Sequence, residues 1–177
     1  MKDCNKCVLS KGRKSIVNGE GPLHAGMAFI GEAPGEREDV EGRPFVGRSG
    51  KFLSKVLSEH GIDRSAVFIT NVVRCRPPGN RRPSEGEIAN CRDYLIDELK
   101  KVKPKVVVAL GASALRSLNG FTGRLGDVVG SEQNVVLGGL VLSVVPCYHP
   151  SVAMRNKRLR AAFSEAISAA STISNRP

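Results

Sequence analysis

Four carboxylates cluster within eight residues of one glycine-rich stretch near the start of the chain. The stretch, residues 31–50, reads GEAPGEREDVEGRPFVGRSG and follows the apolar run MAFI at residues 27–30. The apolar run is typical of a buried strand. In open α/β sheets, ligands bind at the carboxyl ends of strands, and loops at that edge commonly carry chemistry. We therefore expect a flexible loop that contributes acidic groups to a functional site. The four are Glu32, Glu36, Glu38 and Asp39.

Polar and basic side chains also follow two later apolar runs, in residues 71–83 and 146–155. Asn71 offers both a donor and an acceptor, which is the pattern needed to read a base edge, although a turn role is open. His149 could donate a hydrogen bond to a developing anion, although a purely structural histidine is open too. Phe45, inside a polar loop, suits a stacking platform or an anchor of the loop.

The sequence contains five cysteines, which require a structural or functional explanation. Cys4 and Cys7 form a CxxC pair, Cys75 follows the second apolar run, and Cys91 lies in a predicted helix. Four thiolates suffice for a tetrahedral zinc site or for a [4Fe–4S] cluster, and their spacing alone favours neither. Two unrelated buried thiols beside a terminal CxxC are the alternative. Cys147 is expected to be a buried thiol near the site.

Charge and hydropathy narrow the class of protein. The chain has 177 residues with 27 Lys and Arg against 17 Asp and Glu, a net charge of +10. Such a surplus favours a polyanionic partner, nucleic acid first, or else a generally solubilising surface. No apolar run approaches the roughly 20 residues that span a bilayer, and the polar N-terminus lacks a signal-peptide core. We therefore expect a protein of the cytoplasm, a compartment in which thiols stay reduced, and we expect no membrane contact.

The elements that must position these residues alternate along the chain. Continuous apolar runs predict strands covered on both faces, and amphipathic segments between them predict helices. The strands are expected at residues 27–30, 67–73, 106–110 and 141–145, the helices at 49–60, 84–102, 112–118 and 159–173, and a small hairpin at 127–129 with 134–137. This alternation predicts one α/β domain over residues 1–177, a three-layer α/β/α sandwich with a four-stranded parallel sheet.

Three motifs, taken together with four cysteines, resemble a known family. The motifs are GEAPGEREDVEGRPFVGRSG, ITNVVRCRPPGNRRP and YHPSVAMR, in this order, and the likeness runs from residue 4 to about residue 155. The chain is similar in these features to the family 4 iron–sulfur uracil-DNA glycosylases. The resemblance implies the uracil-DNA glycosylase fold and hydrolysis of the N-glycosidic bond of deoxyuridine, which leaves free uracil and an abasic site. It also implies a structural [4Fe–4S] cluster on Cys4, Cys7, Cys75 and Cys91.

The resemblance implies catalytic roles for two side chains. Glu38 would position the attacking water and stabilise an oxocarbenium-like sugar, with Asp39 in support. His149 would stabilise the leaving uracil anion by hydrogen bonding. In the place of the Gln-Asp pair of the family 1 glycosylases this chain has Glu32 and Ala33, so the water role must move to another carboxylate. Their tyrosine is absent as well.

The resemblance also implies how the base and the DNA would be held. Phe45 would stack on uracil, Asn71 would bond its O4/N3 edge, and backbone groups of Gly31 and Glu32 would line the pocket. A duplex base must first be flipped out.

The DNA-binding residues implied by the resemblance are Ser151, Met154, Arg155, Arg81 and Arg82, of which Met154 and Arg155 would fill the vacated stack. Residues 79–83 lack the histidine of a covalent-adduct branch, which implies turnover. The expected partner is uracil-containing DNA, single- or double-stranded, bound by a monomer whose activity is associated with the nucleoid.

Three alternatives stay open on the sequence. One is a glycosylase of the same superfamily with broader specificity for deaminated bases. Another is a non-catalytic iron–sulfur protein that binds single-stranded DNA. The third is a zinc-stabilised nucleotide-binding domain.

Overall fold

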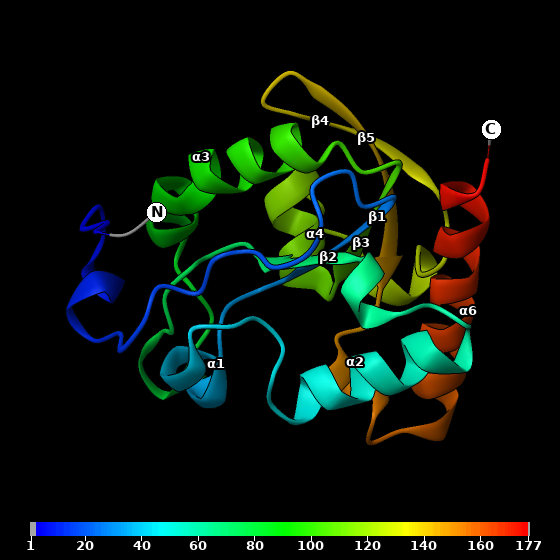
Figure 1. The fold of residues 1–177 in the computed structure, drawn as a ribbon, viewed down its shortest axis with the longest axis horizontal. Helices are drawn as coiled ribbons and strands as arrows, with labels where there is room; N and C mark the ends of the chain where they lie inside the picture. The colour runs from blue at the N-terminus through cyan, green and yellow to red at the C-terminus, as the bar shows by residue number, and fades with distance from the viewer. Residues whose placement is uncertain (1–2, 177) are drawn as a thin grey trace.

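A five-stranded sheet forms the middle layer of the molecule (Figure 1). The computed structural model describes residues 3–176. The strands are β1 (Met27–Gly31), β2 (Phe68–Asn71), β3 (Val106–Leu110), β4 (Gln133–Leu137) and β5 (Leu140–Cys147), in the order β2-β1-β3-β5-β4. The first four in this order are parallel, and β4 runs antiparallel to β5. The predicted four parallel strands are confirmed, but the sheet has a fifth strand that makes it mixed.

The fifth strand corrects the predicted hairpin. Residues 127–129 do not pair with β4, because Leu125–Asp127 forms a 3-10 turn. Instead β4 pairs with β5, its sequence neighbour. The turn between them is Gly138-Gly139, with φ values of 56° and 81°. Positive φ at both central residues is what a tight two-residue hairpin requires, and glycine adopts it without steric cost.

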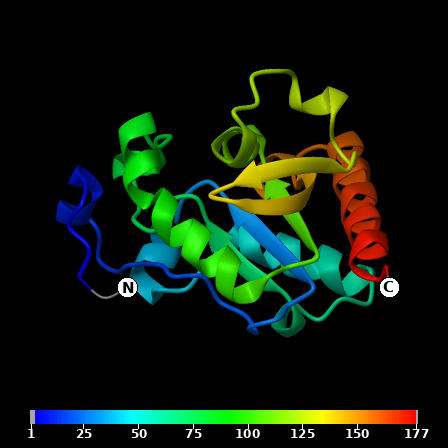
Figure 2. The same ribbon diagram turned by 90° about the horizontal axis from the view of Figure 1, so that it is seen from above.

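Helices cover both faces of the sheet (Figure 2). On one face lie α3 (Glu85–Val102) and α4 (Ala112–Asn119), and on the other lie α2 (Arg48–Glu59) and α6 (Lys157–Ser174). These four helices match the predicted ones. The strand residues alternate between the two apolar clusters, as Ile30 packs toward α3 and Phe29 toward α2 and α6. This is the predicted three-layer arrangement.

Two short helices were not predicted, α1 (Glu36–Glu41) and α5 (Pro150–Ala153). The first corrects the expectation of a flexible acidic loop. Its acidic residues stand in the first turn, where the helix dipole favours negative charge, and Gly42 ends it with a φ of 70°. Since a helix fixes the direction of its side chains, the carboxylates of this stretch are held apart rather than gathered.

The N-terminal strap, residues 13–20, runs from the cysteines along α1 and β2. Its backbone N–H groups at Lys14 and Ser15 donate to the buried carboxylate of Asp39, at 2.9 and 3.3 Å. Further on, Glu20 and Ile69 exchange two backbone hydrogen bonds. The strap therefore ties α1 to the outer strand of the sheet.

The topology places a crevice at the centre of one sheet edge. From β1 the chain passes to β2 on one side, while β3 lies on the other. At such a switch point the loops after the parallel strands separate, which opens a site for a ligand. In residues 3–176 there is no helix with the length and apolar character needed to cross a membrane.

Candidate active site

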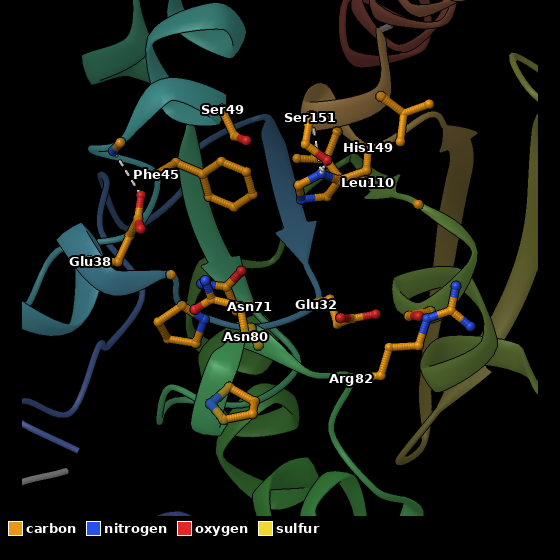
Figure 3. Close-up of a pocket in the computed structure, with 18 of the residues that line it drawn as sticks. Glu32, Glu38, Phe45, Ser49, Asn71, Asn80, Arg82, Leu110, His149 and Ser151 are labelled. Carbon is orange, nitrogen blue, oxygen red and sulfur yellow. Dashed lines mark hydrogen bonds between the residues drawn. The ribbon is translucent and has the colours of Figure 1, made fainter. Parts of the chain in front are cut away.

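A cavity of about 650 Å³ opens at the carboxyl ends of the four parallel strands (Figure 3). Glu32, Glu38, Phe45, Asn71 and His149 line it, although they were singled out on three separate segments of the sequence. The convergence expected from the parallel strands is therefore observed. The complete lining comprises residues 32–38, 45, 47–49, 71, 77, 80–82, 110–113, 125, 148–149 and 151–152.

Glu38 is held in place by two glycines. Its Oε1 accepts a hydrogen bond of 2.8 Å from the backbone N–H of Gly47. A Cβ added at Gly35 would lie 2.8 Å from its Oε2, and one at Gly47 would lie 3.1 Å from its Oε1. The neighbouring Asp39 hydrogen-bonds to the N-terminal strap instead, so it holds the helix that carries Glu38.

Phe45 adopts a backbone conformation that is unusual for a bulky residue. Its φ is +53°, in the left-handed region, and strain of this kind often marks functional sites. Two contacts enforce it: Arg64 donates a 2.7 Å hydrogen bond to the carbonyl of Pro44, and a Cβ at Gly50 would lie 1.6 Å from the carbonyl oxygen of Phe45. The ring faces His149 across the cavity, 6.2 Å between ring centroids.

Asn71 lines the cavity and carries a buried amide oxygen without a hydrogen-bond partner among residues 3–176. The residue is only 2% exposed. A buried polar atom without a partner is unfavourable by about 1–3 kcal/mol, which a ligand donor could recover. The figure shows the amide below the Phe45 and His149 rings.

Gly31 makes room for two of these groups instead of lining the cavity as predicted. A Cβ at this position would lie 2.5 Å from Oδ1 of Asn71 and 2.5 Å from Cζ of Phe45. Its carbonyl is taken by the backbone N–H of Val72. Glu32 does line the cavity, and Figure 3 places it beside Arg82.

His149 is held in one tautomer by Ser151. Its Nδ1 accepts from the backbone N–H of Ser151 at 3.2 Å and lies 2.7 Å from the Ser151 hydroxyl. The ring proton is therefore on Nε2. Burial lowers the pKa of His149 to about 4, against the opposing effect of the Glu38 charge. The imidazole is a neutral hydrogen-bond donor near pH 7.

The predicted DNA-binding residues lie in different environments. Arg81 and Arg82 both line the cavity, and Arg81 also forms a two-point ion pair with Glu87, at 2.7 and 2.8 Å. Met154 and Arg155 do not line the cavity.

Val152, which was not predicted from the sequence, lines the cavity with 48% of its surface exposed. The sequence carried no signal for it, because the exposure of this side chain depends on the short helix α5, which was not predicted.

A further missed segment follows β3. Gly111, Ala112 and Ser113 line the cavity at the start of α4, and Gly111 has a φ of 100°. The sequence carried a signal for them, because β3 is one of the parallel strands and its carboxyl end had to meet the same edge.

The four candidate metal ligands are free thiols, and Cys75 and Cys91 are buried in the same core cluster, with Cys7 packed against it. Arg13 donates 3.4 Å to the sulfur of Cys75 and 2.7 Å to the carbonyl of Cys4. Within residues 3–176 the structure contains no group of three or more His, Cys, Asp or Glu side chains arranged to hold a metal ion.

Hydrogen-bond donors and cations surround the Cys4 thiol. Burial works to raise its pKa, but hydrogen bonds from Tyr94 and from the backbone of Lys6, with the charges of Arg13 and Lys6, hold that pKa below its usual value. The same hydrogen bond raises the pKa of Tyr94 to about 12. Such donors suit a sulfur that carries negative charge.

Known proteins are similar in sequence to this chain over most of its length. The family model described as the uracil DNA glycosylase superfamily matches residues 18–170. The type-4 uracil-DNA glycosylase of Pyrobaculum aerophilum is 43% identical over 169 residues, 93% of this chain and 86% of that protein. That of Saccharolobus solfataricus is 41% identical over 93% of this chain and 79% of that protein. That of Thermotoga maritima is 43% identical over 89% of this chain and 81% of that protein.

Gly31→Ala should lower the free energy of unfolding by about 1–3 kcal/mol, because the new methyl group would overlap Phe45 and Asn71. Gly86→Ala is the matched control, since a Cβ there meets nothing within 4 Å and alanine favours a helix. Denaturant unfolding of both variants measures the effect. Equal stabilities would contradict the close approach at Gly31.

Stability should depend on pH through His149. The ordinary pKa of 6.5 applies to the unfolded chain, and the folded value is about 4. Between these values the unfolded state binds the proton more readily, so the free energy of unfolding should fall as the pH falls, by up to about 3 kcal/mol. Unfolding curves across this range should show a smaller pH slope for His149→Gln. An identical slope in the variant would refute the lowered pKa.

Proposed function

Because this chain belongs to the type-4 uracil-DNA glycosylase family, within the uracil DNA glycosylase superfamily, we propose that it hydrolyses the N-glycosidic bond of deoxyuridine in DNA. The products are free uracil and DNA with an abasic site. One observation carries the proposal beyond family membership: Asn71, whose buried amide oxygen has no hydrogen-bond partner among residues 3–176, lines a cavity that also presents an aromatic ring and a neutral imidazole donor.

Base recognition falls to Asn71 and Phe45. Uracil presents a donor at N3 and an acceptor at O4, which an amide group can pair with its oxygen and its NH₂. Cytosine presents the opposite pattern at these atoms and would leave the buried amide unpaired. The Phe45 ring supplies a face on which the pyrimidine stacks. The contacts of Arg64 and Gly50 that fix the strained backbone of Phe45 hold that face in position before the base arrives.

His149 stabilises the leaving group. As the glycosidic bond breaks, negative charge collects on uracil O2, and a donor aimed there lowers the barrier by several kcal/mol. The neutral ring provides Nε2–H for this bond, because Nδ1 is occupied by Ser151. Ser151 therefore acts on the reaction by orienting the imidazole.

Glu38 acts on the sugar side of the bond. Cleavage passes through an oxocarbenium-like state, as in glycoside hydrolysis, and a nearby carboxylate stabilises that cation and positions the attacking water. The hydrogen bond from Gly47 leaves Oε2 of Glu38 for this task. Asp39 supports it indirectly, since its contacts with the strap fix α1.

DNA binding uses the rim of the cavity. Flipping a base out of a duplex costs a few kcal/mol, which phosphate contacts and an inserted side chain offset. Val152, exposed at the rim, fills the vacated stack, and Met154 and Arg155 continue the same loop along the DNA. Arg82 contacts phosphate, whereas Arg81 is held by its ion pair with Glu87.

The protein works as a monomer on single- or double-stranded DNA.

Cys4, Cys7, Cys75 and Cys91 hold a [4Fe–4S] cluster. The type of donor fits, because Cys75 and Cys91 lie in one buried cluster with Cys7 packed against it, Arg13 donates to the sulfur of Cys75, and Tyr94 donates to that of Cys4. When bound, the cluster supplies a structural link between the N-terminus and the segment that follows β2.

Glu38→Gln should reduce the single-turnover rate of uracil release by about 10²- to 10⁴-fold, because the variant loses the charge that stabilises the sugar cation. Glu41→Gln is the control: Glu41 ends the same helix, is exposed and lies outside the cavity. Alkali-induced cleavage of oligonucleotides carrying U·G, U·A, single-stranded U and T·G measures both. A wild-type chain that bound DNA but gave no alkali-labile product from any uracil substrate would contradict the proposed function.

The purified holoprotein should be brown and contain about four irons per chain. Cys75→Ser should lose iron and the visible absorption, whereas Cys147→Ser should keep both, since Cys147 is buried beside Phe163. Iron analysis and the absorption spectrum give a readout that is independent of activity. A colourless protein with one zinc would refute the cluster.

A further inference from the structure

We infer that the ion pair of the fully buried Arg74 with the partly buried Glu98 is a positioning device for Asn71, so that base removal depends on two residues that never touch the base. The inference rests on the proposed function, in which Asn71 pairs with uracil. Arg74 lies three residues after Asn71, and its side chain is 0% exposed.

The guanidinium of Arg74 joins two partners at fixed angles. One terminal nitrogen donates to the backbone carbonyl of Asn71, and the other lies 2.7 Å from Oε2 of Glu98. A planar fork with several donors can hold both acceptors at once, which a lysine ammonium cannot do with the same geometry. The carbonyl of Asn71 is thereby fixed to a helix on the face of the sheet.

Glu98 extends the same hold to the residue before Asn71. Its Oε2 also accepts from the hydroxyl of Thr70 at 2.8 Å, and its Oε1 accepts from the backbone N–H of Gly19 at 2.9 Å. One carboxylate on α3 therefore secures the end of β2 through Thr70 directly and through Asn71 by way of Arg74. The N-terminal strap is tied to the same point.

Stability alone does not account for this pair. Burying the charge of Arg74 carries a desolvation penalty that attraction to the partly exposed Glu98 often only balances, and apolar replacements of such pairs are frequently as stable. In addition, Nε of Arg74 is buried without a hydrogen-bond partner among the described residues. A pair retained with one donor unsatisfied fits a demand for position, and an error of about 1 Å at a reacting group can lower a rate about 100-fold.

Arg74 also contacts the cysteines on its other side. Its backbone N–H donates to the sulfur of Cys91, and the Cys91 and Cys75 thiols attract its charge. The residue stands between the cysteines and the base pocket. A test must therefore separate an effect on Asn71 from an effect on the cysteines.

A double-mutant cycle on the holoenzyme makes this separation. Arg74→Lys and, separately, Glu98→Gln should each lower the single-turnover rate of uracil release by about 10- to 100-fold in the wild-type background. In the Asn71→Ala background each should change the residual rate by less than about twofold, because the residue they position is gone. Iron content is measured for every variant.

Two controls show that the effect passes through Asn71. Arg64→Lys disturbs the Phe45 side of the cavity, where Arg64 contacts Pro44 and Ser54, so it should be additive with Asn71→Ala. Affinity for DNA that already carries an abasic analogue should stay within about twofold of wild type in the Arg74 and Glu98 variants, because no base is left to read. A general structural role would weaken that affinity.

Equal rate losses in both backgrounds, at full iron content, would overturn the inference. If Arg74→Lys loses iron, the Glu98→Gln cycle decides, since the hydrogen bonds of the Glu98 carboxylate go to Arg74, Thr70 and Gly19 and, among the described residues, to no cysteine. A wild-type chain that releases no uracil would refute the proposed function. An active wild type with additive cycles would refute only the positioning role.

Discussion

Phe45 and Asn71 meet over the α-carbon of Gly31, at the end of β1, and only a residue without a side chain leaves room for both. The rest of the site is arranged around that contact. Phe45 needs a left-handed backbone to reach it, and the glycine at position 50 and Arg64 hold that backbone. Asn71 reaches it from the neighbouring strand.

Buried charges hold the segments that carry the site. Several of the 17 acidic side chains are buried or partly buried, although the net charge of the chain is +10. Asp39 fixes α1, Glu87 closes the start of α3 and binds Arg81, and Glu98 secures the end of β2. Each carboxylate accepts hydrogen bonds from backbone or from a cation, as buried charge requires. These acids order the loops, and the proposed DNA contacts fall to cations outside these pairs.

Local signals in the sequence predicted most of the fold. Continuous apolar runs gave the four parallel strands, and the capping pair Ser84 and Glu87 marked the start of α3 as observed. The shorter elements failed for physical reasons. A six-residue helix such as α1 has little periodicity, and the hairpin was misplaced because Gly138-Gly139 was not recognised as its turn. In the site, motif order brought together the right segments, but no sequence pattern shows that Glu87 engages Arg81 or that Val152 faces solvent.

The strap along β2 has a consequence beyond the site. An outer strand of a sheet presents unpaired N–H and C=O groups that can template pairing with another molecule. Here Glu20 occupies both backbone groups of Ile69, and Val17 takes the carbonyl of Arg74 just beyond the strand. The strap thereby shields this rim of the sheet from a second chain. The segment that leads from the cysteines to the sheet therefore also hinders self-association of the chain through the outer edge of β2 during folding.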